Sequence, residues 1–175
     1  MKDYRGFTLV ELMVTLAIAA ILLSIAAPNF VSFIKNNRIT TITNDLLADL
    51  ALARSEAAKR GQAVSVCISS DGLTCTGSNW LGGRLVFADS GTAGTKDGSD
   101  SIIRVSEAKS NGTTMTSSGF SNTGYIRYGA TGTVTTGNTN IGTFKVCDDR
   151  TGSFGRLLSI SNTGRPYVQT AQTCP

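Results

Sequence analysis

Residues 7–27, FTLVELMVTLAIAAILLSIAA, decide the fold of this chain. The stretch is apolar apart from Thr8, Glu11, Thr15 and Ser24. A helix rises about 1.5 Å per residue, so a run of this length spans roughly 30 Å, the thickness of the hydrocarbon core of a bilayer. The stretch therefore predicts a helix that is able to cross a membrane once.

The residues on either side of this stretch predict its orientation. Lys2 and Arg5 precede it, and positive charge favours the cytoplasmic side, so everything after Pro28 is expected to face outward. A cleavable secretory signal has a shorter apolar region that ends at a small-residue cleavage site. Here residues 24–27, SIAA, lead directly into more helix-compatible sequence, so we expect the span to be retained.

Glu11 is the one acidic residue of the apolar stretch. A carboxylate inside a bilayer costs roughly 2.5 to 3.5 kcal/mol on insertion scales, so we expect Glu11 to have a dedicated cationic partner. The alternative is that Glu11, close to the start of the span, extends its side chain to the membrane interface.

The segments RGFTLVEL, residues 5–12, and PNF, residues 28–30, resemble the N-terminus of type IV pilins and pseudopilins. The shared features are a short basic leader, a Gly-Phe junction, a glutamate at a fixed distance and a proline near the outer end of the span. The resemblance implies that residues 1–6 are a prepilin leader. A prepilin peptidase would cut between Gly6 and Phe7 and methylate the new amine of Phe7.

The same resemblance implies how the subunit is assembled. Glu11 would pair with the Phe7 amine of a neighbouring subunit, which supplies the cationic partner. Residues 7–30, which include Pro28, would be the transmembrane and assembly half of the N-terminal helix. The chain is then expected in the bacterial inner membrane as a single-pass protein, with its C-terminal domain in the periplasm, and in the assembled pilus.

A second helical pattern occupies residues 31–61. Apolar residues recur there at steps of three and four, as in an amphipathic helix with one buried face: Ile39, Ile42, Leu46, Leu50, Ala53 and Ala57. The charged residues occupy other faces: Arg38, Asp45, Asp49, Glu56 and Lys59. Lys59 and Arg60 suit a helix C-terminus, and Gly61 can adopt the left-handed capping conformation.

The two patterns predict one long helix from about Phe7 to Arg60, kinked or loosened near Pro28. The alternative is two separate helices, an anchor and a domain helix, because proline has no amide proton to donate and disturbs the helical ladder.

Residues 62–175 predict a small antiparallel β-domain. The chain is rich in glycine (19 residues) and poor in proline (3 residues), and turn signals such as Asp71-Gly72 and Asp97-Gly98 separate short β-branched runs. The expected strands are 63–68, 83–87, 101–105, 124–128, 142–147, 156–161 and 167–168. The predicted class is α+β, with the amphipathic half of the helix packed on one apolar face of the sheets.

The four cysteines are Cys67, Cys75, Cys147 and Cys174. An even number on the outward side of a membrane predicts disulfides, for which three pairings are possible. Cys67 ends a strand and Asp71-Gly72 turns the chain back toward Cys75, so the simplest pairing joins these two and leaves Cys147 with Cys174. A zinc site is the weaker alternative, because the chain has no CxxC pair and no histidine.

Motifs in the body of the sequence resemble the GspH/FimT group of minor pilins and pseudopilins. They are ARSEAAKRG at 53–61, VC at 66–67, WLGG at 80–83, VFAD at 86–89, VCDDR at 146–150 and SNTGR at 161–165. Membership implies a pilin-like fold and, as partners, other minor pilins, a major pilin, prepilin peptidase and the inner membrane.

The group offers three roles. The first is a minor pilin of the FimU kind, which joins a tip or priming complex and supports pilus assembly, with adhesion, twitching and DNA uptake as downstream roles. The second is a DNA receptor of the FimT kind, used in natural transformation. The third is a pseudopilin of a type II secretion system, a role that the resemblance disfavours because the pilus members of this group more often carry such cysteine pairs.

The DNA-receptor role depends on basic residues near the C-terminus. The FimT kind carries a Gly-Arg-x-Arg motif, of which this chain keeps the first arginine, Arg165. If Arg150, Arg156 and Arg165 gathered on one face, they would give weak, salt-sensitive phosphate binding, and Tyr167 would stack on a base. The alternative, which we favour, is that these arginines form a solvated rim.

The composition argues against catalysis. The chain has no histidine, which removes Ser-His-Asp and Cys-His chemistry, and its scattered carboxylates lack a catalytic spacing. Asp89, Asp97 and Asp100 surround a glycine-rich loop, but their spacing misses the EF-hand pattern and favours a polar turn over a calcium site. We therefore expect no enzyme activity, no cofactor and no resident metal.

Overall fold

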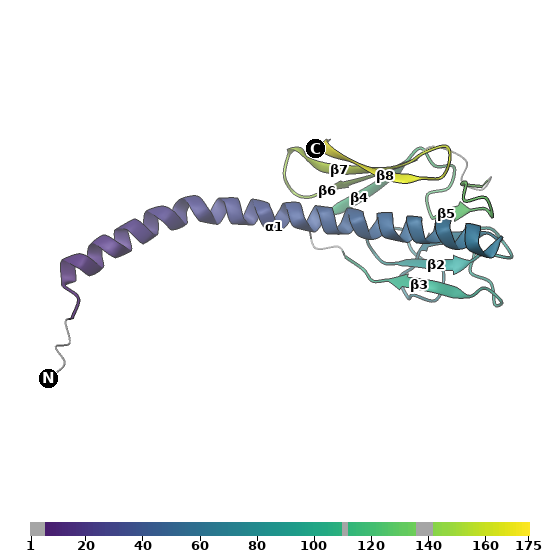
Figure 1. Cartoon of the computed structure of the whole chain (residues 1–175), viewed down its shortest axis with the longest axis horizontal. Coiled ribbons are helices and arrows are strands. Elements are labelled where there is room, and N and C mark those ends of the chain that lie inside the picture. Colours follow the sequence, from purple (N-terminus) through teal and green to yellow (C-terminus); the bar gives the residue numbers. More distant parts are fainter. Residues whose placement is uncertain (1–5, 110–111, 136–141) are drawn as a thin grey trace. The chain divides into compact units, whose positions relative to one another are not determined.

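The computed structural model describes residues 6–109, 112–135 and 142–175, and within them it contains one helix and eight strands (Figure 1). The helix α1 spans Leu9–Arg60. The strands are β1 Val64–Ile68, β2 Arg84–Ala88, β3 Ile102–Ser106, β4 Thr114–Ser118, β5 Tyr125–Tyr128, β6 Thr143–Cys147, β7 Gly152–Ile160 and β8 Pro166–Cys174. The predicted α+β class is confirmed.

α1 passes through Pro28 without interruption, so the alternative of two separate helices is wrong. Side chains next to the proline bond to the helical backbone: the amide of Asn29 donates to the carbonyl of Ile25 at 3.1 Å. At the other end, Gly61 has a φ of +63° and ends the helix in the left-handed conformation, as predicted. The chain divides into two compact units, Met1–Asn37 and Arg38–Pro175.

The second unit contains two antiparallel sheets of four strands each. Their strand orders are β3-β2-β1-β5 and β4-β6-β7-β8. The sequence missed β4, whose residues TMTSS include one buried apolar side chain, Met115. It also predicted β8 much too short, because this edge strand, PYVQTAQTC, is mostly polar.

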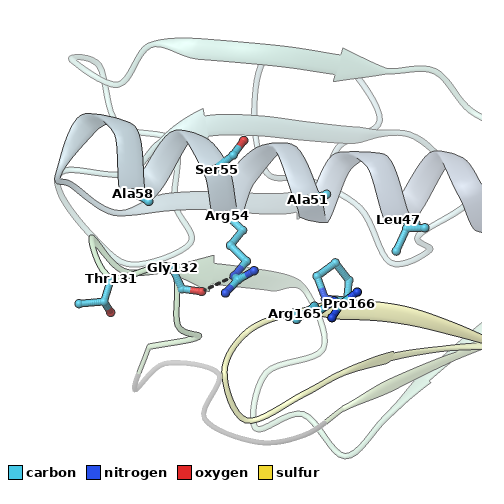
Figure 2. A pocket seen from close by; sticks show the side chains of 9 residues that line it. All are labelled: Leu47, Ala51, Arg54, Ser55, Ala58, Thr131, Gly132, Arg165 and Pro166. Atoms are coloured by element: carbon cyan, nitrogen blue, oxygen red, sulfur yellow. Dashed lines mark hydrogen bonds between the residues drawn. The ribbon is translucent and has the colours of Figure 1, made fainter.

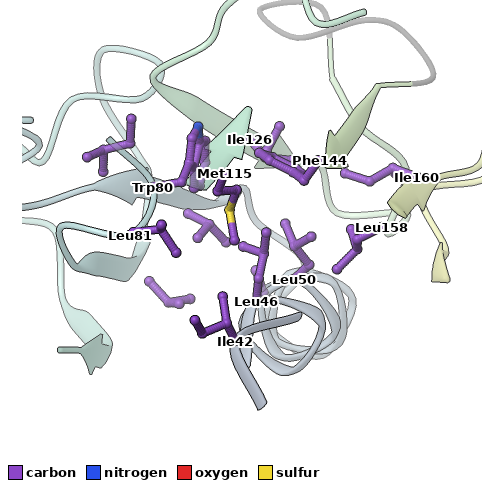
Figure 3. Packing of buried hydrophobic residues seen from close by; sticks show 14 of the residues in the cluster. Ile42, Leu46, Leu50, Trp80, Leu81, Met115, Ile126, Phe144, Leu158 and Ile160 are labelled. Carbon is purple, nitrogen blue, oxygen red and sulfur yellow. The ribbon is translucent and has the colours of Figure 1, made fainter. Parts of the chain in front are cut away.

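The core lies between residues 39–57 of α1 and both sheets. Ile42, Leu46 and Leu50 of the helix face side chains from the two sheets, as Figure 3 shows. Trp80, which we expected to be a core residue, is 3% exposed and packs edge-on against Phe144 with ring centroids 4.9 Å apart. The amphipathic pattern of the sequence therefore identified the buried face of the helix.

A buried ion pair joins α1 to the first sheet. The Asp49 carboxylate has no exposed surface, and it accepts a hydrogen bond at 2.7 Å from Nε of Arg84, which is 3% exposed. Its other oxygen lies 3.2 Å from Nε of Arg104 and accepts the Ser106 hydroxyl at 2.9 Å. The expectation that Asp49 lies away from the buried face was wrong, because β2 and β3 cover that side of the helix too.

Two disulfides, Cys67–Cys75 and Cys147–Cys174, each link residues of the second unit. This is the pairing that the turn between Cys67 and Cys75 favours. In that turn Asp71 accepts hydrogen bonds from the hydroxyl of Thr74 and from two backbone N–H groups, which lower the pKa of its carboxyl. The second bridge attaches the last residues of β8 to the end of β6.

Removing the Cys147–Cys174 bridge, by changing both residues to alanine, is expected to lower the free energy of unfolding by about 3.5 kcal/mol. The cysteines are 27 residues apart, so the bridge removes more entropy from the unfolded chain than the 8-residue bridge does. Denaturant unfolding of the detergent-solubilised chain, followed by Trp80 fluorescence, measures the change. The matched control is the Cys67→Ala/Cys75→Ala variant, expected to lose about 2.5 kcal/mol; a larger loss in the control contradicts this account.

Candidate functional site

The first turn of α1 is capped by its own sequence. The hydroxyl oxygen of Thr8 accepts a hydrogen bond from the backbone N–H of Glu11 at 3.2 Å, and α1 begins at Leu9. Thr8 and Glu11 therefore have the Thr-x-x-Glu spacing of a capping box, and the Glu11 carboxylate sits where the helix dipole favours negative charge. Sequence reasoning missed this local role, although the three-residue spacing shows it.

The apolar residues of this part of α1 are uncovered. Phe7 is 83% exposed, and none of the apolar window that is long enough to cross a membrane is buried. Exposed large side chains follow on all sides of the helix: Leu9, Val10, Leu12, Met13, Val14, Leu16, Ile18, Ile21, Leu22, Leu23 and Ile25. Such a surface is stable only in a lipid or against other apolar helices.

Gly6 is exposed and precedes the helix. A Cβ atom placed on Gly6 would meet no atom of the described residues within 4 Å, so these residues impose no steric demand for glycine there. The remaining residues of the expected leader, which include Lys2 and Arg5, lie outside the described residues.

Arg150, the first of the DNA-binding candidates, is engaged in a local structure. Its Nη2 donates to Asp148 at 2.7 Å, and its guanidinium carbon lies 4.2 Å from the centroid of the Phe154 ring. Burial tends to raise the pKa of Asp148, but the hydrogen bonds and the charge of Arg150 outweigh it and lower the pKa. A phosphate would have to compete with this ion pair.

The other DNA-binding candidates do not gather with Arg150. Arg156 pairs with Val146 and so lies, half-buried, on the core-facing side of its sheet. Tyr167 is 41% exposed and projects from the opposite side, because the next residue of its strand packs against the core. Arg165 precedes β8, at the other end of β7 from Arg150, roughly 30 Å along the strand.

The carboxylates of the glycine-rich loop bond to the loop itself. Asp97 accepts a backbone N–H at 2.8 Å, and Asp100 accepts the backbone N–H and the hydroxyl of Ser90 at 3.0 and 2.6 Å. Asp89 lies 3.1 Å from Nε of Arg127. These contacts fit the polar turn that we favoured from the sequence.

A groove that the sequence did not predict lies between α1 and two loops of the second unit (Figure 2). The volume of this open groove is about 440 Å³. Its lining residues include two arginines and no acidic residue: Leu47, Ala51, Arg54, Ser55, Ala58, Thr131, Gly132, Arg165 and Pro166. Three aliphatic side chains of the helix form one wall, so the groove combines an apolar surface with positive charge.

Arg54 holds the two loops of the groove together. Its Nε donates to the carbonyl of Gly132 at 2.9 Å, and its Nη2 donates to the carbonyl of Thr163 at 3.2 Å. The loops touch closely, because a Cβ on Gly164, whose φ is +78°, would lie 2.4 Å from the Gly132 carbonyl oxygen. By contrast, the guanidinium of Arg165 has no hydrogen-bond or ion-pair partner among the described residues.

Two family models match the chain. The model described as type II transport protein GspH matches residues 43–164, which include the C-terminal part of α1 and most of the β-domain. The model of the prokaryotic N-terminal methylation motif matches residues 1–27. Together they extend over both units.

Individual relatives agree with these matches. Fimbrial protein Q of Moraxella bovis is 37% identical over 82 residues, a match that covers 44% of this chain and about half (52%) of that protein. The crystal structure of the type IV minor pilin FimU of Pseudomonas aeruginosa superposes with a TM-score of 0.63 at 23% identity, covering 82% of this chain and 96% of FimU. The minor pseudopilin EpsH of Vibrio cholerae gives 0.50 at 13% identity, covering 76% and 97%. At these identities the two structures show a shared fold.

Proposed function

Because the chain belongs to the GspH family and carries the N-terminal methylation motif of pilins, we propose that it is a minor type IV pilin of a tip or priming complex. The family consists of structural pilins and pseudopilins, which assemble with other pilins. In the proposed role the chain starts or stabilises a pilus rather than forming most of its length.

The observation that carries this proposal is the uncovered apolar part of α1. No part of its membrane-length window is buried, yet its first turn carries Glu11. Helix capping and the helix dipole offset only about 1 kcal/mol of the cost of a carboxylate in lipid, whereas a subunit that packs beside other apolar helices can pair it with a cation. The helix and the motif support a membrane-anchored pilin, and we place its β-domain in the periplasm and residues 7–30 in the inner membrane.

The proposal includes processing of the leader. Prepilin peptidase would remove residues 1–6 by cutting between Gly6 and Phe7, and the new amine of Phe7 would be methylated. The exposure of Gly6 and Phe7 supports this step, since a protease needs an accessible, extended segment. Residues 31–61 then form the amphipathic half of the helix and residues 62–175 the β-domain.

Gly6→Leu is expected to leave the leader attached and to abolish entry into pili, because a side chain at the cut would clash in the peptidase. No described residue would touch a Cβ at that position, so the effect would report on the peptidase and not on folding. Intact-mass measurement of the membrane fraction shows whether the leader and the added methyl group are present. The matched control is Gly98→Leu, at another glycine with nothing within 4 Å, which should be processed normally.

The same strains test the role itself. A strain lacking this chain should make few pili and should recover them with the wild-type chain and with Gly98→Leu but not with Gly6→Leu. A mature-sized Gly6→Leu protein would contradict the processing step. Recovery of protein secretion instead of pili would identify a type II secretion pseudopilin.

The two alternatives have less support. The fold is shared by FimU and EpsH, so it does not separate a pilus from a secretion system, and the similarity to fimbrial protein Q favours the pilus. For a DNA receptor, Arg150 is ion-paired and lies at the other end of β7 from Arg165 and Tyr167, while Arg156 lies on the core-facing side of the sheet. No described contact favours phosphate binding by these four residues as a group.

A further inference from the structure

We propose that the groove between Arg54 and Arg165 binds a carboxylate-bearing segment of a neighbouring pilin subunit, an inference that depends on the proposed assembly role. The groove lies wholly within the second unit, on the outer part of α1, and is independent of Glu11 and the apolar part of the helix.

The positive charge of the groove favours an anionic ligand. It places two guanidiniums beside a lining that contains no carboxylate. Arg54 is held by the carbonyls of Gly132 and Thr163, so its position is set before any ligand arrives. Arg165 has no side-chain partner among the described residues, and in Figure 2 it lies beside Pro166, below Arg54 in the view. One fixed and one available guanidinium suit a carboxylate, which can accept from two donors at once.

The apolar wall indicates that the carboxylate belongs to a polypeptide. Leu47, Ala51 and Ala58 offer aliphatic contact next to the charges, which matches the methylene groups of a glutamate or a neighbouring small residue. The groove, with a volume of about 440 Å³, has room for a few side chains.

A nucleic acid fits these observations less well. Its strand carries a phosphate at every nucleotide and is bound by basic residues that continue along a path. At the groove, Pro166 pairs with Ile160, and Arg156 lies four residues before Ile160, which is about 13 Å along the strand. Arg150 is farther away and is ion-paired. These arginines therefore do not continue the charge of the groove along a path.

The test uses the full, detergent-solubilised chain and two probe peptides, acetyl-Ala-Glu-Ala-amide and its glutamine counterpart. In ¹⁵N NMR titrations we expect the glutamate peptide to shift the Arg54 and Arg165 Nε–H signals and the Gly132 amide, with a dissociation constant on the order of 1 mM. Arg165→Gln should weaken this binding about tenfold. Lys59→Gln, which removes an exposed charge at the end of α1, should not change it.

Each other outcome overturns the proposal. Equal shifts with both peptides would indicate an apolar site without carboxylate selectivity. Shifts with a thymidine oligonucleotide and none with the peptide would indicate a nucleic-acid site. Unchanged signals with every probe would show that the groove binds none of them.

A photo-crosslinker in place of Ser55 extends the test to the cell. We expect it to join the chain to another pilin subunit at a peptide that contains Asp or Glu, and Arg165→Glu should reduce the product about tenfold. If the chain enters pili but forms no such product, the groove proposal fails while the assembly role stands. If the chain is absent from pili, the assembly role itself fails.

Discussion

Glu11→Ala is expected to reduce incorporation of the chain into pili by about two to almost four orders of magnitude while its membrane level stays unchanged. In the proposed assembly the Glu11 carboxylate pairs with the Phe7 amine of a neighbouring subunit in a low-dielectric surrounding. Breaking a buried pair by removing one partner costs roughly 3 to 5 kcal/mol, which corresponds to this change in an association constant. Quantitative immunoblots of sheared pili and of the membrane fraction measure both quantities.

Glu11→Gln separates this role from helix capping. Glutamine serves as well as glutamate in a capping box, so the variant keeps the local function that the Thr8 contact indicates and loses only the charge. We expect it to assemble as poorly as Glu11→Ala. If Glu11→Gln entered pili at the wild-type level, Glu11 would act through the helix terminus and the intersubunit pair would be wrong.

Asp49→Ala is expected to lower the free energy of unfolding by about 3 to 5 kcal/mol. The variant leaves the charge of Arg84, which is 3% exposed, without its carboxylate in the interior. Denaturant unfolding of the full chain in detergent, followed by fluorescence, measures the loss. Trp80 is the single tryptophan of the chain, and its carbonyl accepts a hydrogen bond from Arg84, so the signal comes from the affected region.

Two variants test the cause of this loss. Asp45→Ala, at another residue of α1, breaks a partly exposed pair with Lys109 of the segment after β3 and is expected to cost at most about 1 kcal/mol. Asp49→Leu/Arg84→Met replaces both buried charges with apolar groups and is expected to recover most of the stability. Equal losses in Asp49→Ala and Asp45→Ala would show that burial of the pair is not what matters.

The sequence predicted the features that local patterns control. The steps of three and four from Ile39 to Ala57 marked the buried face of α1, and Gly61 marked its end. The Asp71-Gly72 turn indicated the near disulfide and so left the other pair. These features follow from residues close together in the chain, which is why periodicity and turn chemistry were enough.

The features that the sequence missed depend on distant residues. Asp49 looked like a solvated helix charge because its partner Arg84 is 35 residues away. Strand β4 has one apolar residue, Met115, so its sequence lacks the alternation that marks a half-buried strand, and its pairing with β6 keeps it extended. The groove combines α1 with loops near Gly132 and Arg165, so no single segment of the chain shows it.

The positions of the two disulfides determine how the β-domain would respond to a pulling force. One bridge lies in the sheet of β1 and the other in the sheet of β6, and neither connects the two sheets. Under tension the sheets can part from α1 without breaking a covalent bond, so the force of first rupture depends on packing around Leu46 and Leu50 and on the buried ion pair of Asp49. The Cys147–Cys174 bridge prevents the chain between its ends, a sequence separation of 27 residues, from being stretched, which shortens the fully extended chain by roughly 90 Å. It therefore limits how far the ruptured domain extends.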